Sequence, residues 1–235
     1  MSEDWWHVIA LPDGSVTAGG WDLRETAEQI PWPDLTGKHC LDVGTADGFW
    51  AFEMERRGAA SVLATDFPSP FQARSRQRFE RAHEALGSSV RYEERDVFEV
   101  EGGWDVVFMG YVLQMLRDPI GALGHVRSLG GRHLLVLETV SLPLEAIPAP
   151  LARLDGRRDG REWFVFNRRG LRKAVELAGW GVEEQSGLLH DRAGPHPDAQ
   201  KASRSWKYRS GMRGRSCALR AAATRTPTTL FGRSG

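Results

Sequence analysis

The sequence has little cysteine, no long hydrophobic run and no net charge, and each absence excludes a class of protein. Only Cys40 and Cys217 are present, and no Cys or His residues stand at metal-ligand spacing, so neither a disulfide framework nor a metal site is predicted. No apolar run reaches the roughly 18 to 20 residues that a membrane-spanning helix needs. The first residues also lack the basic and apolar parts of a secretory signal, so we expect a cytoplasmic protein that makes no membrane contact.

The charge is unevenly distributed along the chain. The 31 Lys and Arg residues equal the 31 Asp and Glu residues, yet from Lys201 onward there are nine basic residues and no acidic ones. This basic segment is either a solvated loop or an anion-attracting surface. Residues 224–235 are rich in Thr, Arg and Gly, a composition that cannot form a core, so we expect a disordered tail there.

The 235 residues, 41% of them hydrophobic, are typical of one compact soluble domain. Short apolar runs alternate with helical patterns, which indicates βαβ units and a parallel sheet. We expect strands at residues 39–43, 61–65, 90–94, 104–109, 133–138, 182–188 and 216–223. We expect helices at residues 48–57, 71–86, 119–129 and 168–178. The predicted fold is a doubly wound, Rossmann-like sheet of seven mostly parallel strands with an antiparallel last strand.

Segments outside this pattern are predicted to surround a ligand. Residues 1–36 precede the first strand and contain Trp5, Trp6, Trp21 and Trp32, so they form either an aromatic lid over the ligand or a segment that buries its indoles against the sheet. The binding domain itself spans residues 37–223. Two long connections, 141–166 and 189–215, leave the carboxyl ends of strands, where ligands of open α/β sheets bind. We expect both connections on the substrate side.

The strongest motif is DVGTADG at residues 42–48, where an apolar strand runs into a turn and then a helix. Gly44 and Gly48 permit a tight turn and a close approach of the backbone to a ligand. Ala46 stands where nucleotide-binding turns carry a middle glycine, and no P-loop lysine follows. The motif therefore disfavours an ATP-hydrolysing P-loop.

Acidic residues follow the next two predicted strands. Asp66 lies about twenty residues beyond the turn, where a carboxylate accepts the ribose hydroxyls of a bound nucleoside. Asp96 follows the third strand and could accept the exocyclic amine of an adenine, while Met109 and Gly110 end the fourth strand with an apolar wall. Asp is common in turns after strands. Its occurrence at successive strand ends nevertheless favours a nucleoside site.

Over residues 32–223 this pattern resembles the class I S-adenosylmethionine-dependent methyltransferases. The resemblance implies an enzyme that moves a methyl group from S-adenosylmethionine to an oxygen or nitrogen of a small or nucleoside-like acceptor. Dinucleotide dehydrogenases share the turn and the second acid, but they fit the third and fourth strands less well. The cofactor-binding residues that follow from the motif and its surroundings are Trp21, Asp42, Gly44, Thr45, Ala46, Asp47, Gly48, Asp66, Phe67, Asp96, Val97, Met109 and Gly110.

Within that class, several stretches are similar to the tRNA wobble-uridine methyltransferase and carboxymethyltransferase group and its bacterial relatives. They are residues 32–35, 47–50, 108–110, 116–119 and 137–139. The carboxymethyl branch holds the extra carboxylate of its cofactor with a tyrosine, where this sequence has Leu113, so the resemblance favours ordinary methyl transfer. A tRNA-modifying enzyme and a non-catalytic cofactor-binding scaffold remain the alternatives.

Two residues are candidates for contact with the acceptor. His190, at the end of the sixth predicted strand, is the first candidate for a general base, and a solvated loop histidine is its ordinary interpretation. Tyr111 follows the fourth strand, where it either faces the acceptor or packs beside the cofactor. His7, His125 and His196 have weaker placement.

Overall fold

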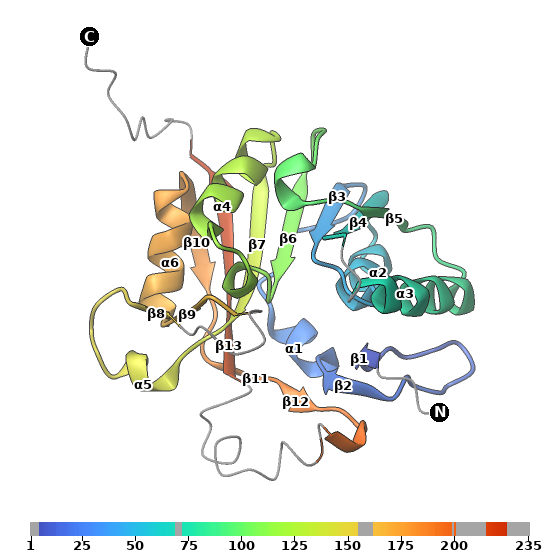
Figure 1. Ribbon diagram of the computed structural model, residues 1–235. Helices are drawn as coiled ribbons and strands as arrows, with labels where there is room; N and C mark the ends of the chain where they lie inside the picture. Colours follow the sequence, from blue (N-terminus) through green and yellow to red (C-terminus); the bar gives the residue numbers. More distant parts are fainter. Residues whose placement is uncertain (1–4, 69–71, 155–161, 199, 201–214, 225–235) are drawn as a thin grey trace.

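A computed structural model describes residues 5–68, 72–154, 162–198, 200 and 215–224 of the chain, and a central sheet organises them (Figure 1). The eight strands of this sheet are β3 (His39–Val43), β4 (Ser61–Asp66), β5 (Arg91–Glu94), β6 (Val106–Gly110), β7 (His133–Thr139), β10 (Trp180–Gln185), β11 (Leu189–His190) and β13 (Arg215–Ala223). Seven of them form the order β10-β13-β7-β6-β3-β4-β5, and β11 pairs with β13.

The directions of the strands confirm the predicted fold. β4 pairs in parallel with β3 and β5, and β6 pairs in parallel with β3 and β7. β13 runs antiparallel to both of its neighbours, β7 and β10. The structure is therefore a mixed α/β, Rossmann-like fold whose last strand is antiparallel, as the sequence predicts.

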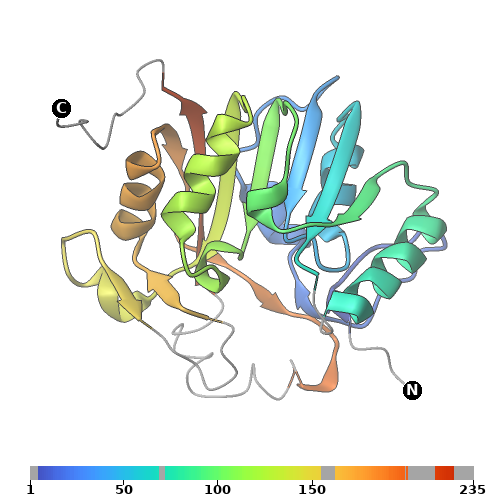
Figure 2. The same ribbon diagram turned by 45° about the horizontal axis from the view of Figure 1, so that its top comes forward.

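Helices cover both faces of the sheet (Figure 2). They are α2 (Phe49–Arg56), α3 (Gln72–Leu86), α4 (Pro119–Ser128) and α6 (Arg168–Leu177). The starts of two helices are fixed by side chains: Asp118 accepts the Gly121 N–H at 2.8 Å, and Asn167 accepts the Gly170 N–H at 2.7 Å. One core cluster lies under α4 and α6, and the other lies under α2 and α3.

The strands alternate between these two clusters, as a sheet that is buried on both faces requires. In β3, Leu41 and Val43 belong to the cluster under α4 and α6, whereas Cys40 belongs to the opposite cluster. In β6, Met109 and Phe108 divide in the same way. The side chain of Met109 is therefore part of the core, although the sequence places this residue beside the cofactor.

A small second sheet covers the carboxyl ends of the parallel strands (Figure 1). It contains β1 (Trp5–His7), β2 (Gly19–Asp22) and β12 (Arg192–Ala193) in the order β1-β2-β12, and β2 leads into α1 (Arg24–Gln29). We call residues 5–30 together with β12 the cap. The sequence predicts a lid in residues 1–36, but it gives no sign that a strand from residues 189–215 completes it.

The long connections contain short elements. Residues 141–166 include α5 (Leu142–Glu145) and the hairpin of β8 (Ala152–Leu154) and β9 (Phe164–Phe166). Two 3-10 helices, η1 (Val97–Glu99) and η2 (Leu113–Met115), follow β5 and β6. None of the helices in the described ranges is long and apolar enough to cross a membrane. Two sequence predictions, the basic residues 201–214 and the tail from residue 225, lie outside the described residues.

Candidate functional site

The glycine turn directly follows β3 and is held against β4. The N–H groups of Gly44 and Thr45 both donate to the Thr65 carbonyl, at 2.8 and 3.0 Å. Gly44 has φ +76°, and a Cβ at this position would lie 2.4 Å from Cγ2 of Val112. Gly48, with φ +93°, precedes α2, while Ala46 takes a left-handed φ of +51° without being glycine. The turn therefore needs glycine for both conformation and space.

The acids predicted to bind a nucleoside lie along one edge of the sheet, because β3, β4 and β5 are neighbours. Asp66 ends β4, and its two carboxyl oxygens accept the N–H groups of Ala46 and Phe67 at 3.1 and 2.9 Å. Asp96 follows β5 and accepts the Phe98 N–H at 2.9 Å. Phe67 is 56% exposed, whereas Val97 is buried. The structure thus brings the predicted nucleoside-facing residues together.

Asp42 is a buried acid with few compensating contacts. Neither of its carboxyl oxygens, nor the hydroxyl of the nearby Thr45, has a hydrogen-bond partner of standard geometry among the described residues. Burial raises the pKa of Asp42 to about 7; the Thr45 hydroxyl opposes this rise, and the charge of Asp66 adds to it. Buried polar atoms without well-formed hydrogen bonds are costly, so their grouping at the glycine turn is typical of a site that a polar ligand completes.

Asp47 connects the glycine turn to the cap. One carboxyl oxygen accepts the backbone N–H groups of Trp6 and His7, each at 2.9 Å, and the other contacts Nδ1 of His7. The sequence assigns Asp47 to the cofactor. In the structure its carboxylate instead holds β1 over the turn, and no feature of the sequence links it to His7, 40 positions away.

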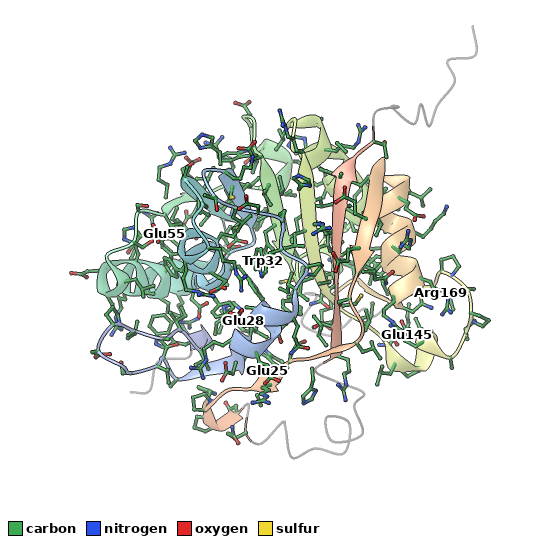
Figure 3. The ribbon with its side chains drawn as sticks, turned by 180° about the vertical axis from the view of Figure 1, so that it is seen from behind. Glu25, Glu28, Trp32, Glu55, Glu145 and Arg169 are labelled. Carbon is green, nitrogen blue, oxygen red and sulfur yellow. The ribbon has the colours of Figure 1, made fainter. Side chains whose placement is uncertain are left out.

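The tryptophans before β3 have different environments. Trp21 lies in β2 between His7 and Ala193 and is half-buried. Trp32, labelled in Figure 3, stacks on Phe108 with ring centroids 5.5 Å apart and donates its indole N–H to the Ala27 carbonyl at 2.8 Å. Trp32 is therefore a packing residue, whereas Trp21 belongs to the cap.

Gly110 and Tyr111 bring the end of β6 close to the core aromatics. A Cβ at Gly110 would lie 2.6 Å from the ring of Phe108, so only glycine fits. Tyr111 adopts a left-handed φ of +59°, and its N–H donates to the Leu137 carbonyl at 2.7 Å. A non-glycine residue in this region stores backbone strain, which is frequent at functional sites.

The Tyr111 hydroxyl faces a buried acid that the sequence does not reveal. Asp191 accepts hydrogen bonds from the hydroxyls of Ser216, at 2.9 Å, and Thr26, at 3.2 Å. The Tyr111 hydroxyl acts on the same carboxylate but lies outside the geometry of a standard hydrogen bond. Burial raises the pKa of Asp191 to about 6, whereas the adjacent His190 is exposed. The residues around Asp191 come from α1, β13 and the segment after β6, which are distant along the chain, and the sequence carries no local signal of this grouping.

Glu138 shapes the segment after β6. This residue lies near the end of β7, and one of its carboxyl oxygens accepts the Leu113 N–H at 2.6 Å, while the other has no partner among the described residues. Burial raises the pKa of Glu138 to about 8. Its position at the end of an otherwise apolar strand was the available sequence signal.

A separate polar hollow of about 300 Å³ lies at the start of α6. It is lined by Glu145, Arg168, Arg169, Gln185 and Ser186, and Figure 3 shows two of them, Glu145 and Arg169. Glu145 already accepts the side chain of Arg168 at 2.9 Å. This hollow therefore lies at the β10 end of the sheet, apart from the glycine turn.

Comparison with known protein families assigns the chain to one of them. A family model described as a methyltransferase domain matches residues 22–185, which include β3 to β10 and all three acids at the strand ends. The chain belongs to this methyltransferase family. The resemblance seen in its glycine turn and acids is thereby confirmed at the level of the family. A search of curated proteins finds no match to the methyltransferase.

Solved structures share the fold of the methyltransferase at low sequence identity. An S-adenosylmethionine-dependent methyltransferase from Mesorhizobium loti is 16% identical, covers 85% of this chain and 97% of its own, and has a TM-score of 0.58. Magnesium protoporphyrin IX methyltransferase from Synechocystis, with bound S-adenosylhomocysteine, is 18% identical over 81% of this chain and 76% of its own, at a TM-score of 0.56. The [4+2]-cyclase SpnF is 15% identical over 85% of this chain and 79% of its own, at a TM-score of 0.62.

Proposed function

We propose that this protein transfers a methyl group from S-adenosylmethionine to an oxygen or nitrogen of a small-molecule acceptor. The observation that carries the proposal is the glycine turn after β3, with Asp66 at the end of β4 and Asp96 after β5 along the same edge of the sheet. Ligands of open α/β sheets bind outside this edge. Membership of the methyltransferase family and the S-adenosylhomocysteine in a neighbour of the same fold support the choice of cofactor.

The residues at this edge fit the cofactor. Asp66 would accept the ribose hydroxyls, and Asp96 with the buried Val97 would hold the adenine. Asp42 and Thr45, whose buried oxygens have no standard partner in the described ranges, would take the polar methionine end. When bound, the cofactor supplies an electrophilic methyl group on a sulfonium. The chain orients the acceptor and excludes water, and positioning of this kind contributes roughly 7 to 11 kcal/mol to lowering a barrier.

The acceptor is expected between the cap and the segments after β6 and β7. Tyr111 lies there in a strained conformation, beside Asp191 and Ser216. His190 lies close along the chain but on the surface. Tyr111 therefore remains a candidate for acceptor contact, and His190 is a weaker candidate for a base than its position in the sequence implies.

Calorimetry with S-adenosylmethionine and S-adenosylhomocysteine tests the cofactor. We expect both to bind and Asp66→Ala to weaken binding at least about tenfold, because the lost carboxylate would have accepted ribose hydroxyls. Asp34→Ala is the matched control, since this exposed aspartate lies before β3 and accepts the Thr36 N–H at 2.9 Å. Binding of NAD in place of both compounds would overturn the proposal.

A tRNA acceptor is the alternative favoured by the similarity of five short stretches to wobble-uridine enzymes and by the basic residues after Lys201. Contacts to phosphates weaken steeply with salt, so a gel shift with total tRNA over a salt series tests it. No shift at low salt would remove this alternative. Transfer of labelled methyl from the cofactor to a metabolite extract distinguishes a methyltransferase from a non-catalytic scaffold. This test is needed because the same fold serves other roles, as the [4+2]-cyclase neighbour illustrates.

A further inference from the structure

His7 and Asp47 join the cap to the glycine turn through a buried pair of side chains. Asp47 Oδ1 contacts His7 Nδ1, and Oδ2 accepts two backbone N–H groups of β1. The Asp47 side chain is 0% exposed and the His7 side chain 11%. The two backbone bonds already dock β1 on the turn. The bond to the ring has a separate effect: it fixes the orientation and the tautomer of the imidazole.

The chemistry of Asp47 assigns the tautomer of the His7 ring. A carboxylate can only accept, so Nδ1 donates and the lone pair of the neutral ring is on Nε2. Within the described residues, Nε2 takes part in no hydrogen bond, although the ring retains some exposure. An imidazole oriented by a buried carboxylate, with its second nitrogen open, is the arrangement by which proteins prepare a general base.

The His7 ring lies next to residues of the glycine turn and of the start of α2. The His7 ring lies 5.6 Å from that of Phe49, the first residue of α2, and its strand neighbour is Trp21. The charged groups that face it are Asp47 on the turn and Asp42 at the end of β3. His7 thus stands over the turn at the carboxyl ends of the strands, where ligands of such sheets bind.

We propose that His7, held by Asp47, is the general base of methyl transfer, so that the acceptor carries its nucleophile as an O–H or N–H group. This rests on the proposed function. Nε2 takes the proton of the acceptor as the acceptor atom bonds to the methyl carbon; the carbon–sulfur bond breaks and its electron pair stays on sulfur. The products are the methylated acceptor, S-adenosylhomocysteine and an imidazolium whose charge is balanced by Asp47.

Nitrogen NMR of the histidines in the full chain tests the orientation without any acceptor. We expect the neutral ring of His7, assigned with His7→Gln, to carry its proton on Nδ1 and none on Nε2. Asp47→Asn should change this tautomer distribution, because an amide can also donate. A ring of His7 protonated on Nε2 alone in the wild type would overturn the proposal. His39→Gln is the matched control, since this exposed histidine contacts Ser61 at the opposite end of β3.

Transfer of labelled methyl from S-adenosylmethionine to a metabolite extract, from about pH 5 to about pH 9, tests the base itself. We expect His7→Gln to bind S-adenosylhomocysteine like the wild type, to lose roughly a hundredfold or more in rate, and to lose the decline toward low pH. His39→Gln should keep both rate and profile.

The outcomes separate the base from the function. A variant His7→Gln that transfers methyl at the wild-type rate, or that fails to bind S-adenosylhomocysteine while folded by circular dichroism, would overturn the role of His7 alone. In the second case the ring serves the cofactor and not the acceptor. A wild-type protein that binds no S-adenosylhomocysteine and yields no labelled product would instead overturn the proposed function, and the base with it.

Discussion

At the scale of single residues, Gly44 meets two separate constraints. Its φ of +76° disfavours any residue with a side chain, and its Cβ would also lie 2.4 Å from Val112. Gly130 shares only the first constraint, with φ +81° and nothing within 4 Å of a Cβ. We expect Gly130→Ala to cost about 1 to 2 kcal/mol of unfolding free energy, from the left-handed backbone alone.

Gly44→Ala should cost more than Gly130→Ala and should also weaken binding of S-adenosylhomocysteine, because relief of the contact with Val112 moves the turn. Urea unfolding and calorimetry measure the two effects. Equal losses of stability in both variants, with unchanged affinity in Gly44→Ala, would show that the close approach of Val112 has no part in the site.

We expect the carboxyl group of Asp42 to lower the stability of the ligand-free protein at neutral pH and to strengthen cofactor binding. Its folded pKa of about 7 lies above that of the unfolded chain, so its stabilising effect is complete at acid pH and is lost as pH rises through 7. Above that pH the buried charge destabilises the ligand-free protein. The cost is roughly 1.4 kcal/mol for each unit by which the folded pKa exceeds the unfolded pKa. Asp42→Asn should therefore be more stable than the wild type at pH 8 in urea unfolding, yet bind the cofactor more weakly.

The control for Asp42 lies at the opposite edge of the sheet. Asp105 accepts the His39 N–H at 3.0 Å, and this bond lowers its pKa. Asp105→Asn should leave cofactor affinity unchanged and give no gain in stability. If Asp42→Asn instead loses stability at pH 8 with full affinity, the carboxylate serves the fold and not the ligand.

At the scale of elements, the cap depends on the close approach of its strands. A Cβ at Gly19 would lie 2.1 Å from the carbonyl carbon of His7, whereas Gly14, in the same cap, has open space around it. We expect Gly19→Ala to separate β1 from β2 and to speed hydrogen exchange in residues 5–22, with the central sheet unaffected. Gly14→Ala should show no such separation, and an undisturbed cap in Gly19→Ala would contradict the close packing of these two strands.

The same elements show what sequence can and cannot predict. Most strands of the central sheet are largely apolar runs that alternate with helical patterns, and this alternation predicts their positions. β5 (Arg91–Glu94) is polar, and β11 has only two residues. β1, β2 and β12 have two to four residues each, too few for any periodicity to appear, and β12 joins β2 from some 170 residues away. The places of Asp66 and Asp96 in the fold were predictable because both residues stand at the ends of predicted strands. Asp191 was missed because its partners Thr26 and Ser216 are 165 and 25 positions away along the chain.

At the scale of the whole molecule, three buried carboxyl groups couple stability to pH. The folded pKa values of Asp191, Asp42 and Glu138 are raised to about 6, 7 and 8. Each group binds its proton more tightly in the folded protein, so the stability they provide is complete at acid pH and declines as pH rises through 6 to 8. We expect the unfolding free energy in urea to fall from about pH 5 to about pH 9.

Replacement of these carboxyl groups by neutral amides should flatten the decline of stability with pH. A variant that combines Asp191→Asn with Glu138→Gln should lose less stability over the same range than the wild type, and addition of Asp42→Asn should flatten it further. A wild-type protein whose stability rises with pH across this interval would show that the three carboxyl groups ionise without penalty.

The position of β13 in the sheet also affects how the protein folds during its synthesis. Among the described strands it is synthesised last, yet it lies between β7 and β10. While the chain leaves the ribosome, β7 and β10 have no partner on their facing edges until residues 215–223 arrive. Unpaired edges recruit other chains. Chaperone demand in the cell should therefore depend on how fast this late segment is delivered.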